Sequence, residues 1–292
     1  MKYLIQTARP RQWVKSAFLL TPALFTLQVL NPDVWLRLFY GMFGFSLIAS
    51  AVYTLNDILN REEDRHHPLK RHRPIAAGRL SIQGASIWAV CLLLFGTGLM
   101  LQAGQHATLF GLVYFALMML YSMLLRKYYL VDVLVIAVGF VLRVEAGAGI
   151  IEEPVSHWLL LCTFTIALYM AMIKRRQEIA TLSKQEISTR QALRSYPCLS
   201  IIDGWIAALG GMTVLCYALY TVDPATVAKH QTGALLYTVP FVVYGIFRYR
   251  TLTDIGGAGE DPAGLVLNDT GIRLVVVLWA LTVGAILFFA GN

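Results

Sequence analysis

Long apolar segments constrain this chain of 292 residues more than any other feature. A helix needs about 20 apolar residues to cross a bilayer, and polar breaks divide the chain into nine apolar segments of roughly that size. Only 14% of the residues are charged, against about 25% in soluble domains. We therefore predict an all-α, polytopic membrane bundle with nine transmembrane helices, in which residues 1–292 form a single integral-membrane domain. The nine segments are expected at about Ser16–Leu30, Trp35–Asn56, Ile82–Gln102, Thr108–Leu125, Leu130–Ile151, His157–Ile173, Ile201–Tyr220, Gly233–Tyr249 and Ile272–Ala290.

The basic residues indicate which side of the membrane each loop occupies. The chain carries 24 Lys and Arg and a net charge of +7. All of these residues except Arg37, Arg143 and Lys229 lie at the amino terminus or in the loops that follow the even-numbered spans. Because cytoplasmic loops are enriched in Lys and Arg, we predict that the amino terminus and these loops are cytoplasmic, in a cytoplasmic (inner) membrane. Membrane topology explains the positive charge, so no nucleic-acid partner is expected.

The loop after the second span contains the most informative polar residues. Asp57, Asn60 and Asp64 are spaced i, i+3 and i+7, so they share one face if the helix continues beyond the membrane. At 1.5 Å per residue, the two aspartates would then stand about 10 Å apart along the axis. Mg²⁺ commonly takes one or two carboxylates together with waters and substrate phosphates. The spacing therefore predicts that Asp57, Asn60 and Asp64 bind Mg²⁺ together with a diphosphate.

Basic residues follow this acidic face within ten positions, at Lys70, Arg71 and Arg73. This order suits an anion that is held by a metal on one side and by cations on the other. The alternative interpretation is a solvated, charged helix end followed by a basic loop. The histidines in this stretch are interpreted as solvated loop residues rather than metal ligands: His66, His67 and His72.

Several motifs resemble those of the UbiA superfamily of intramembrane transferases. The main one is Asn56-Asp57-x6-Asp64 followed by Arg65-x-His67-Pro68-x-Lys70-Arg71-x-Arg73-Pro74-Ile75-Ala76-Ala77-Gly78. Within the superfamily, the chain is most similar to the branch that transfers phosphoribose to a polyprenyl phosphate. Three further stretches support that branch: Arg9-Pro10-Arg11-Gln12-Trp13-Val14-Lys15, Gly139-Phe140-x2-Arg143, and Asp261-Pro262 with Leu265 to Asp269. The chain departs from the family pattern at Asn60, where the family has Asp.

The resemblance implies a UbiA-like fold and a Mg²⁺-dependent enzyme that uses 5-phospho-α-D-ribose 1-diphosphate and a polyprenyl phosphate lipid. It implies catalytic roles for Asp57, Asp64 and Arg73. The attacking lipid phosphate is already anionic, so no general base is expected. A homo-oligomer is compatible with this assignment. The residues expected to contact substrates are Arg9, Lys15, Asn56, Lys70, Arg143, Lys174, Arg175 and Glu178.

The segment after the sixth span reads Lys174-Arg175-Arg176-Gln177-Glu178, where prenyltransferases of the superfamily carry a second aspartate-rich motif. A basic segment suits two phosphate-bearing substrates, because each phosphate monoester carries about −1.5 to −2 charges. The alternative is a basic flank that anchors the span at anionic lipid headgroups. Arg143 lies inside the fifth span, where charged groups usually face a cavity. We expect it near the phosphates and leave the role of Glu145 open.

Two other function classes fit the same overall pattern. One is a UbiA-type prenyltransferase that joins a prenyl diphosphate to an aromatic or glycerol acceptor, which the basic segment after the sixth span disfavours. The other is a transporter or lipid-binding protein of the same topology. Transporters usually contain internal repeats or broken helices with polar groups at the membrane midplane. Here the charges gather at one end of the spans, so we favour an enzyme.

Overall fold

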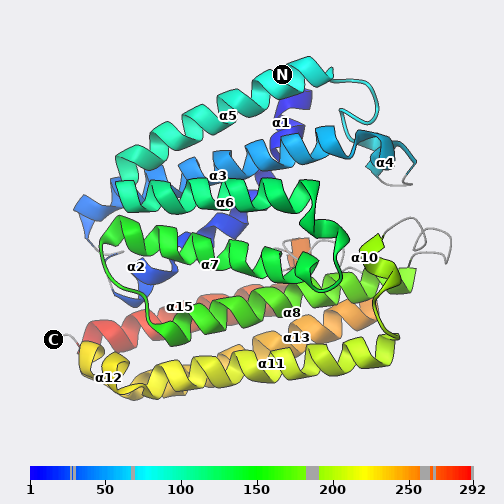
Figure 1. Ribbon diagram of the computed structural model, residues 1–292. Coiled ribbons are helices and arrows are strands. Elements are labelled where there is room, and N and C mark those ends of the chain that lie inside the picture. Colours follow the sequence, from blue (N-terminus) through cyan, green and yellow to red (C-terminus); the bar gives the residue numbers. More distant parts are fainter. Residues whose placement is uncertain are drawn as a thin grey trace. The chain divides into compact units, whose positions relative to one another are not determined.

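The computed structural model describes residues 1–26, 28, 31–66, 70–181, 191–256, 264–265 and 268–290 (Figure 1). Every regular element within these ranges is a helix, and they contain no strand, which confirms the all-α fold class. Several residues of the sequence motifs lie outside the described ranges: His67, Pro68, Asp261, Pro262, Val266 and Leu267.

Seven described helices are long and apolar enough to cross a membrane, which makes the chain an integral membrane protein. They are α3 (Pro32–Leu59), α5 (Ile82–Ala103), α6 (Gln105–Met123), α7 (Val131–Ile151), α8 (His157–Thr181), α11 (Leu199–Val222) and α15 (Thr270–Ala290). The first and eighth predicted spans contain shorter or more polar elements, so the count of nine stays a prediction. These elements are η1 (Pro10–Leu20) with α2 (Thr21–Phe25), and η5 (Ala234–Thr238) with α13 (Val239–Gly256).

The chain divides into two compact units. The first comprises Met1–Pro22, Asn31–Arg126 and Leu142–Glu153, and the second comprises Ala23–Leu30, Lys127–Val141 and Pro154–Asn292. Helix α7 supplies residues to both, so the single integral-membrane domain stays a prediction. The short connecting elements are α1 (Lys2–Ala8), α4 (Arg61–His66), η3 (Lys70–His72), η4 (Leu125–Lys127), α10 (Gln191–Arg194) and α12 (Pro224–His230).

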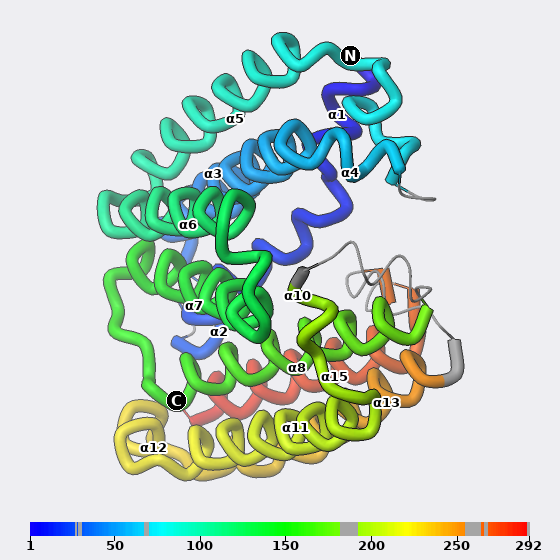
Figure 2. The backbone as a smooth tube through the Cα atoms, turned by 45° about the vertical axis from the view of Figure 1, so that its right-hand side comes forward, coloured from blue at the N-terminus to red at the C-terminus, as the bar shows by residue number. Residues whose placement is uncertain are grey.

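In the first unit, α5 and α6 both pack beside α3 (Figures 1 and 2). The contact between α3 and α5 depends on two facing glycines. A Cβ atom on Gly44 would lie 2.8 Å from the carbonyl oxygen of Gly96, and a Cβ on Gly96 would lie 2.8 Å from that of Gly44. Small residues of this kind let helix backbones approach closely inside a membrane. This close approach fixes the position of α3, which carries Asp57 near its end.

The segment η1 is an unusually long 3-10 helix of 11 residues, since such helices rarely exceed three or four residues. It docks on α3 through side-chain hydrogen bonds. Trp13 Nε1 donates to Ser50 Oγ at 3.0 Å, and Ser46 Oγ donates to the Oγ atom of Ser16 at 2.9 Å. Segment η1 thereby brings the amino-terminal residues onto the helix that carries Asp57.

In the second unit, α8 packs along α11, and α13 contacts both α11 and α15 (Figure 2). The core between them is apolar and includes Tyr169, Ile173, Ile202 and Ile206. The Tyr169 hydroxyl donates to the carbonyl oxygen of Ile246 at 2.9 Å, so its polar atom is satisfied inside the core. This packing fixes the polar end of α8.

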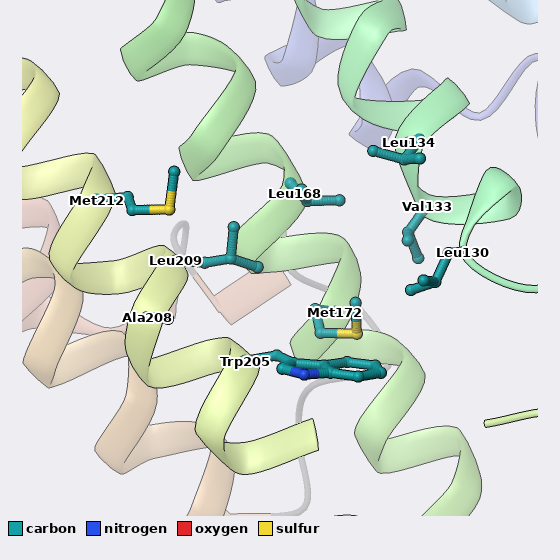
Figure 3. A pocket seen from close by; sticks show the side chains of 9 residues that line it. All are labelled: Leu130, Val133, Leu134, Leu168, Met172, Trp205, Ala208, Leu209 and Met212. Carbon is teal, nitrogen blue, oxygen red and sulfur yellow. The ribbon is translucent and has the colours of Figure 1, made fainter. Parts of the chain in front are cut away.

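An apolar groove of about 310 Å³ lies among α7, α8 and α11 of the second unit (Figure 3). Its nine lining side chains are all apolar or aromatic, and they include Val133, Met172 and Trp205. The lining residues are apolar or aromatic, so they suit a polar ligand poorly. The groove suits a hydrocarbon chain.

Candidate active site

Asp57 and Asp64 lie on two successive helical segments rather than on one straight helix. Helix α3 ends at Leu59, Asn60 takes φ −99° and ψ 11°, and α4 begins at Arg61. The backbone N–H of Asp64 still donates to the carbonyl oxygen of Asn60 at 2.8 Å, so the joint distorts the helix without separating the two segments. The three residues of the predicted metal site therefore flank one joint, with Asn60 at its centre.

One arginine joins the two aspartates. Nη1 of Arg73 lies 2.9 Å from Oδ1 of Asp57 and 2.7 Å from Oδ2 of Asp64. The two carboxylate oxygens cannot be further apart than these two distances combined. The predicted separation of about 10 Å refers to the rise along a helix axis. The side-chain oxygens come closer than that, because both side chains turn toward the same guanidinium.

A second arginine approaches from the amino terminus. Nη2 of Arg9 donates to Oδ1 of Asp57 at 2.5 Å, and its guanidinium carbon lies 5.1 Å from the centre of the Tyr53 ring. Arg9 separates α1 from η1 and has a positive φ of 51°, a conformation that few non-glycine residues adopt. The backbone bend at this residue directs its side chain to α3. The sequence pattern predicts that Arg9 binds a substrate phosphate, whereas in the structure it contacts an aspartate.

Burial makes these ion pairs strong. Asp57 is 2% exposed and Asp64 is 4% exposed, whereas the side chains of Arg9 and Arg73 are 27% and 26% exposed. Burial raises the pKa of Asp64, and the neighbouring Arg73 guanidinium opposes that rise. The charge of Lys70 also lowers the pKa of Asp64, to a smaller extent than Arg73 does.

Asn60 contributes an oxygen atom that lacks a hydrogen-bond donor in the described part of the chain. Its Nδ2 donates to Oδ1 of Asn56 at 2.9 Å, which fixes the orientation of the amide. Its Oδ1 is buried and accepts no hydrogen bond from the described residues. Buried polar atoms are rarely left unpaired. An amide oxygen is the kind of ligand that a hard cation prefers, and Asn60 stands between Asp57 and Asp64 in the sequence.

The donor set is small, which limits what it can bind alone. Among the described residues, no group of three or more His, Cys, Asp or Glu side chains is arranged to hold a metal ion. Two carboxylates and one amide therefore require further oxygen ligands from phosphate or water. This need agrees with the sequence-based expectation that Mg²⁺ binds together with a diphosphate.

Arg143 lies in the part of α7 that belongs to the first unit, and it is only 4% exposed. Its Nη2 donates to the Tyr114 hydroxyl at 2.8 Å, and its guanidinium carbon lies 4.4 Å from the Tyr114 ring centre and 5.1 Å from that of Phe45. Cation–π contacts of this kind stabilise a desolvated charge. The aromatic rings explain how an arginine is accommodated inside a span, while its role near a phosphate stays a prediction.

Lys15 is half-buried in η1, and Asn56 is half-buried in the last turn of α3. The remaining predicted substrate residues, Lys174, Arg175 and Glu178, lie on α8 of the second unit, which extends eight residues beyond the predicted end of the span at Ile173. The structure places them on a rigid helix rather than in a loop.

Arg175 pairs with two acidic residues, and the sequence pattern predicts neither contact. Its Nη2 lies 2.6 Å from Oδ2 of Asp132, and its Nη1 contacts Glu178. Asp132 is fully buried, and its Oδ1 accepts a hydrogen bond from the Tyr196 hydroxyl at 2.8 Å. Two carboxylates thus flank Arg175, although the segment Lys174–Glu178 is basic in its local sequence. Asp132 lies at the start of α7, far from Arg175 in the sequence, so local sequence could not reveal the pair.

A second ion-pair network ties α8 to α11 and α13. Arg176 donates to both carboxylate oxygens of Asp203 at 2.7 and 3.2 Å, and Arg250 contacts Asp203 at 2.5 Å and Asp254 at 3.2 Å. Beside it, Nε2 of the buried Gln177 donates to the carbonyl oxygen of Thr253 at 2.7 Å. These contacts hold the polar end of α8 in position.

The comparisons with known proteins show the family of the chain. Residues 17–263 match the family model described as the UbiA prenyltransferase family. The chain is 31% identical to a decaprenyl-phosphate phosphoribosyltransferase of Mycobacterium tuberculosis, over 98% of this chain and 94% of that protein. It is also 31% identical to the protein of the same name from Corynebacterium glutamicum, over 94% of this chain and 84% of that one.

A solved structure has a similar fold. A UbiA homologue from Archaeoglobus fulgidus, bound to GPP and Mg²⁺, aligns with a TM-score of 0.74 and 16% identity, over 98% of this chain and 99% of that one. The chain therefore has the fold of that homologue.

Proposed function

The chain belongs to the UbiA prenyltransferase family, and we propose that it transfers 5-phosphoribose from 5-phospho-α-D-ribose 1-diphosphate to a polyprenyl phosphate. An oxygen of the lipid phosphate forms a bond to C1 of the ribose, while the bond from C1 to the diphosphate breaks and the diphosphate leaves with its electron pair. Similarity over nearly the whole chain to relatives named for such a transfer supports the proposal. The observation that carries it is the cluster of Asp57, Asp64, Arg73 and Arg9 beside the oxygen of Asn60.

Asp57, Asn60 and Asp64 are proposed to hold Mg²⁺. They provide oxygen ligands only, and the Asn60 oxygen is buried without a partner in the described residues, which fits a hard cation. When bound, the ion supplies positive charge that offsets the negative charge of the departing diphosphate. The remaining ligands would come from the diphosphate and water.

The predicted basic residues of both units divide between the two substrates. Arg73 and Lys70 are proposed to bind the donor phosphates, since both lie near Asp64. Arg9 and Lys15 are proposed for the lipid phosphate or the 5-phosphate. On α8, Lys174 and Arg175 are further ligands for donor phosphates, and Glu178 orients Arg175 by contacting it. Because the lipid phosphate is an anion when it attacks, these residues need only hold the reactants and remove no proton.

We place the hydrocarbon chain of the acceptor in the apolar groove of the second unit (Figure 3). Leu130 and Val133 of the groove flank Asp132, the partner of Arg175, and Met172 precedes Arg175 by about one helical turn on α8. The groove thus begins beside Arg175, a residue proposed to bind the donor phosphates, so a chain lying in it would start near the donor.

A bulky substitution in the groove tests this placement. Ala208→Trp fills the groove and should raise KM for a long-chain polyprenyl phosphate about tenfold, while KM for a two-isoprene acceptor changes little. Leu281→Trp on α15, where Leu281 is 64% exposed, is the matched control. Equal effects of Ala208→Trp on both acceptors would show that the chain binds elsewhere.

The orientation of the protein belongs to the same proposal. The amino terminus and the loops after α3 and α8 are proposed to face the cytoplasm in the inner membrane, because a soluble phosphoribosyl diphosphate is available there. Single cysteines introduced at exposed positions such as Glu62 should then react with an impermeant maleimide only in inverted vesicles.

The direct experiment is a transfer assay with the purified protein in nanodiscs. Radiolabelled phosphoribosyl diphosphate, Mg²⁺ and polyprenyl phosphates of several lengths should yield a labelled lipid and free diphosphate. A parallel reaction with a prenyl diphosphate and an aromatic or glycerol acceptor tests the other activity of the family. Product in the second reaction alone would overturn the proposal and identify a prenyltransferase.

A further inference from the structure

We infer that Arg73 is an internal counter-ion that occupies the space between Asp57 and Asp64 until a diphosphate draws it away, so that a divalent metal binds well only together with the diphosphate. This inference rests on the proposed function. It begins with one nitrogen atom, because Nη1 of Arg73 makes both carboxylate contacts, at 2.9 and 2.7 Å. A single cationic atom therefore lies where a metal shared by the two carboxylates would have to bind.

Arg73 and a metal compete for the same oxygen atoms. Mg²⁺ binds its oxygen ligands at about 2.0–2.1 Å in a strict octahedral arrangement. A guanidinium nitrogen within about 3 Å of the same oxygens would then stand close to a doubly charged ion, in a partly buried site where like charges repel strongly. Metal entry therefore requires Arg73 to leave the carboxylates. Without a nearby anion, that move breaks two charge-assisted hydrogen bonds and replaces neither.

A diphosphate supplies the missing anion. Nε and Nη2 of Arg73 form no hydrogen bond to the described residues, so two donors remain available while Nη1 holds the aspartates. The side chain is 26% exposed and extends from the segment after η3, so it is accessible from outside the cluster. Guanidinium groups bind phosphate through paired hydrogen bonds. A bound diphosphate can therefore take Arg73 from the carboxylates and leave them to the metal.

Arg9 provides a built-in comparison. It contacts Asp57 alone, and it is also held against the Tyr53 ring. Arg9 shares Oδ1 of Asp57 with Arg73, but its departure would free an oxygen of one carboxylate only, whereas the departure of Arg73 frees oxygens of both. Opening the space between the two aspartates therefore depends on Arg73. By linkage, the diphosphate then raises the affinity for the metal by the same factor by which the metal raises the affinity for the diphosphate.

The test measures Mn²⁺ binding by electron paramagnetic resonance on the purified protein, without phosphoribosyl donor or lipid. We expect Arg73→Gln to bind Mn²⁺ about tenfold more tightly than wild type, a factor within the usual range for coupled sites. Arg65→Gln is the matched control, because it removes the same charge from a residue that contacts Glu62 and a carbonyl oxygen rather than the two aspartates. Arg65→Gln should leave Mn²⁺ binding within about twofold of wild type.

Two further arms complete the test. Arg73→Lys keeps the charge and should fall between wild type and Arg73→Gln, so a folding defect in the glutamine variant does not end the experiment. Inorganic pyrophosphate should increase Mn²⁺ binding to wild type about tenfold and to Arg73→Gln much less. Equal Mn²⁺ affinity in wild type, Arg73→Gln and Arg73→Lys, or equal shifts in Arg73→Gln and Arg65→Gln, would overturn the inference. Neither substrate of the transfer is present, so failure here is distinct from failure of the transfer assay.

Discussion

The two charged clusters of the molecule are built differently. In the first unit, two nearly buried aspartates are held by arginines whose side chains are about one quarter exposed, and one nitrogen serves both acids. In the second unit, Arg175 meets its two acids with separate nitrogens, and Arg176 grips Asp203 with two parallel hydrogen bonds. The first cluster can exchange its cation, whereas in the second Asp132 and Glu178 fix the position of Arg175, and Asp203 ties α8 to α11. The same residue types thus form an exchangeable ion pair in one place and fixed ion pairs in the other.

The largest expected effect would come from removing an acid of the first cluster. Asp57→Asn and Asp64→Asn should each lower transfer by about a thousandfold or more, because neither amide can offset the charge of the metal. Measured initial rates in nanodiscs check this, with Glu62→Gln as control, since the Glu62 side chain is 69% exposed on the same helical segment as Asp64. Turnover close to wild type in either variant would remove these residues from the active site.

The next effect concerns stability in the second cluster. Asp132→Asn leaves Arg175 with Glu178 as its remaining acidic partner in a buried place, and breaking a buried ion pair costs about 3 kcal/mol. We expect a lower free energy of unfolding in a detergent titration, with Asp33→Asn at an exposed position as control. If Asp132→Asn left the free energy of unfolding unchanged, Asp132 would not brace α7 against α8, and the comparison would fail.

Asn60→Asp sharpens the comparison by adding an acid to the first cluster. The new carboxylate should raise the affinity for Mn²⁺ in the absence of donor by about 1–3 kcal/mol, because hydrogen bonds and contacts to charged ligands are worth more than those to neutral ones. Isothermal titration of wild type and variant, each with and without the diphosphate donor, measures this. Equal donor-free affinities would place residue 60 outside the metal site.

The smallest effect is on pH dependence. Burial raises the pKa of Asp64 above its usual 3.8, so the folded protein holds this proton more tightly than the unfolded chain does. Between the usual and the raised pKa, stability should fall as pH rises, because the ionised form is disfavoured by burial. Asp64→Asn should abolish that slope in thermal unfolding. Metal binding should have the opposite dependence, so the affinity for the metal should weaken as pH falls through the raised pKa. If the slope of stability against pH persisted in Asp64→Asn, another group would be responsible for that slope.

The sequence-based predictions agree best with the structure where a feature depends on interactions between residues close in the sequence. The third predicted span, Ile82–Gln102, is helix α5 over Ile82–Ala103, because Ser81 caps its start by accepting from the backbone N–H of Gly84. The spacing of Asp57, Asn60 and Asp64 likewise predicts one polar face, because helical geometry places these three positions on the same side. The contact of both carboxylates with Arg73 is what draws them together. That spacing does not predict the pairing with Arg9 and Arg73, since these contacts join residues 48 and 16 positions apart.

The 3-10 conformation of η1 is a second feature that the sequence patterns do not predict. The hydrophobic run from Ser16 predicts an ordinary span, and its apolar composition fits either kind of helix. Only the close fit against α7 reveals the constraint: a Cβ atom on Gly147 would lie 1.9 Å from the carbonyl oxygen of Leu19. The conformation is decided by tertiary contacts, which no local propensity records.

The 3-10 conformation of η1 matches the spacing of its hydrogen bonds to that of their partners on α3. Three residues of a 3-10 helix advance about 6 Å, and so do four residues of an α-helix. Trp13 and Ser16 are three apart on η1, and their partners Ser50 and Ser46 are four apart on α3, so the two hydrogen bonds form rungs at equal spacing. If η1 were an α-helix, the axial separation of Trp13 and Ser16 would fall to about 4.5 Å. The two hydrogen bonds to α3 could then not form together. Arg9, at the next position before η1, would lose its alignment with Asp57, so a distant change in helical pitch would disturb the charge of the active site.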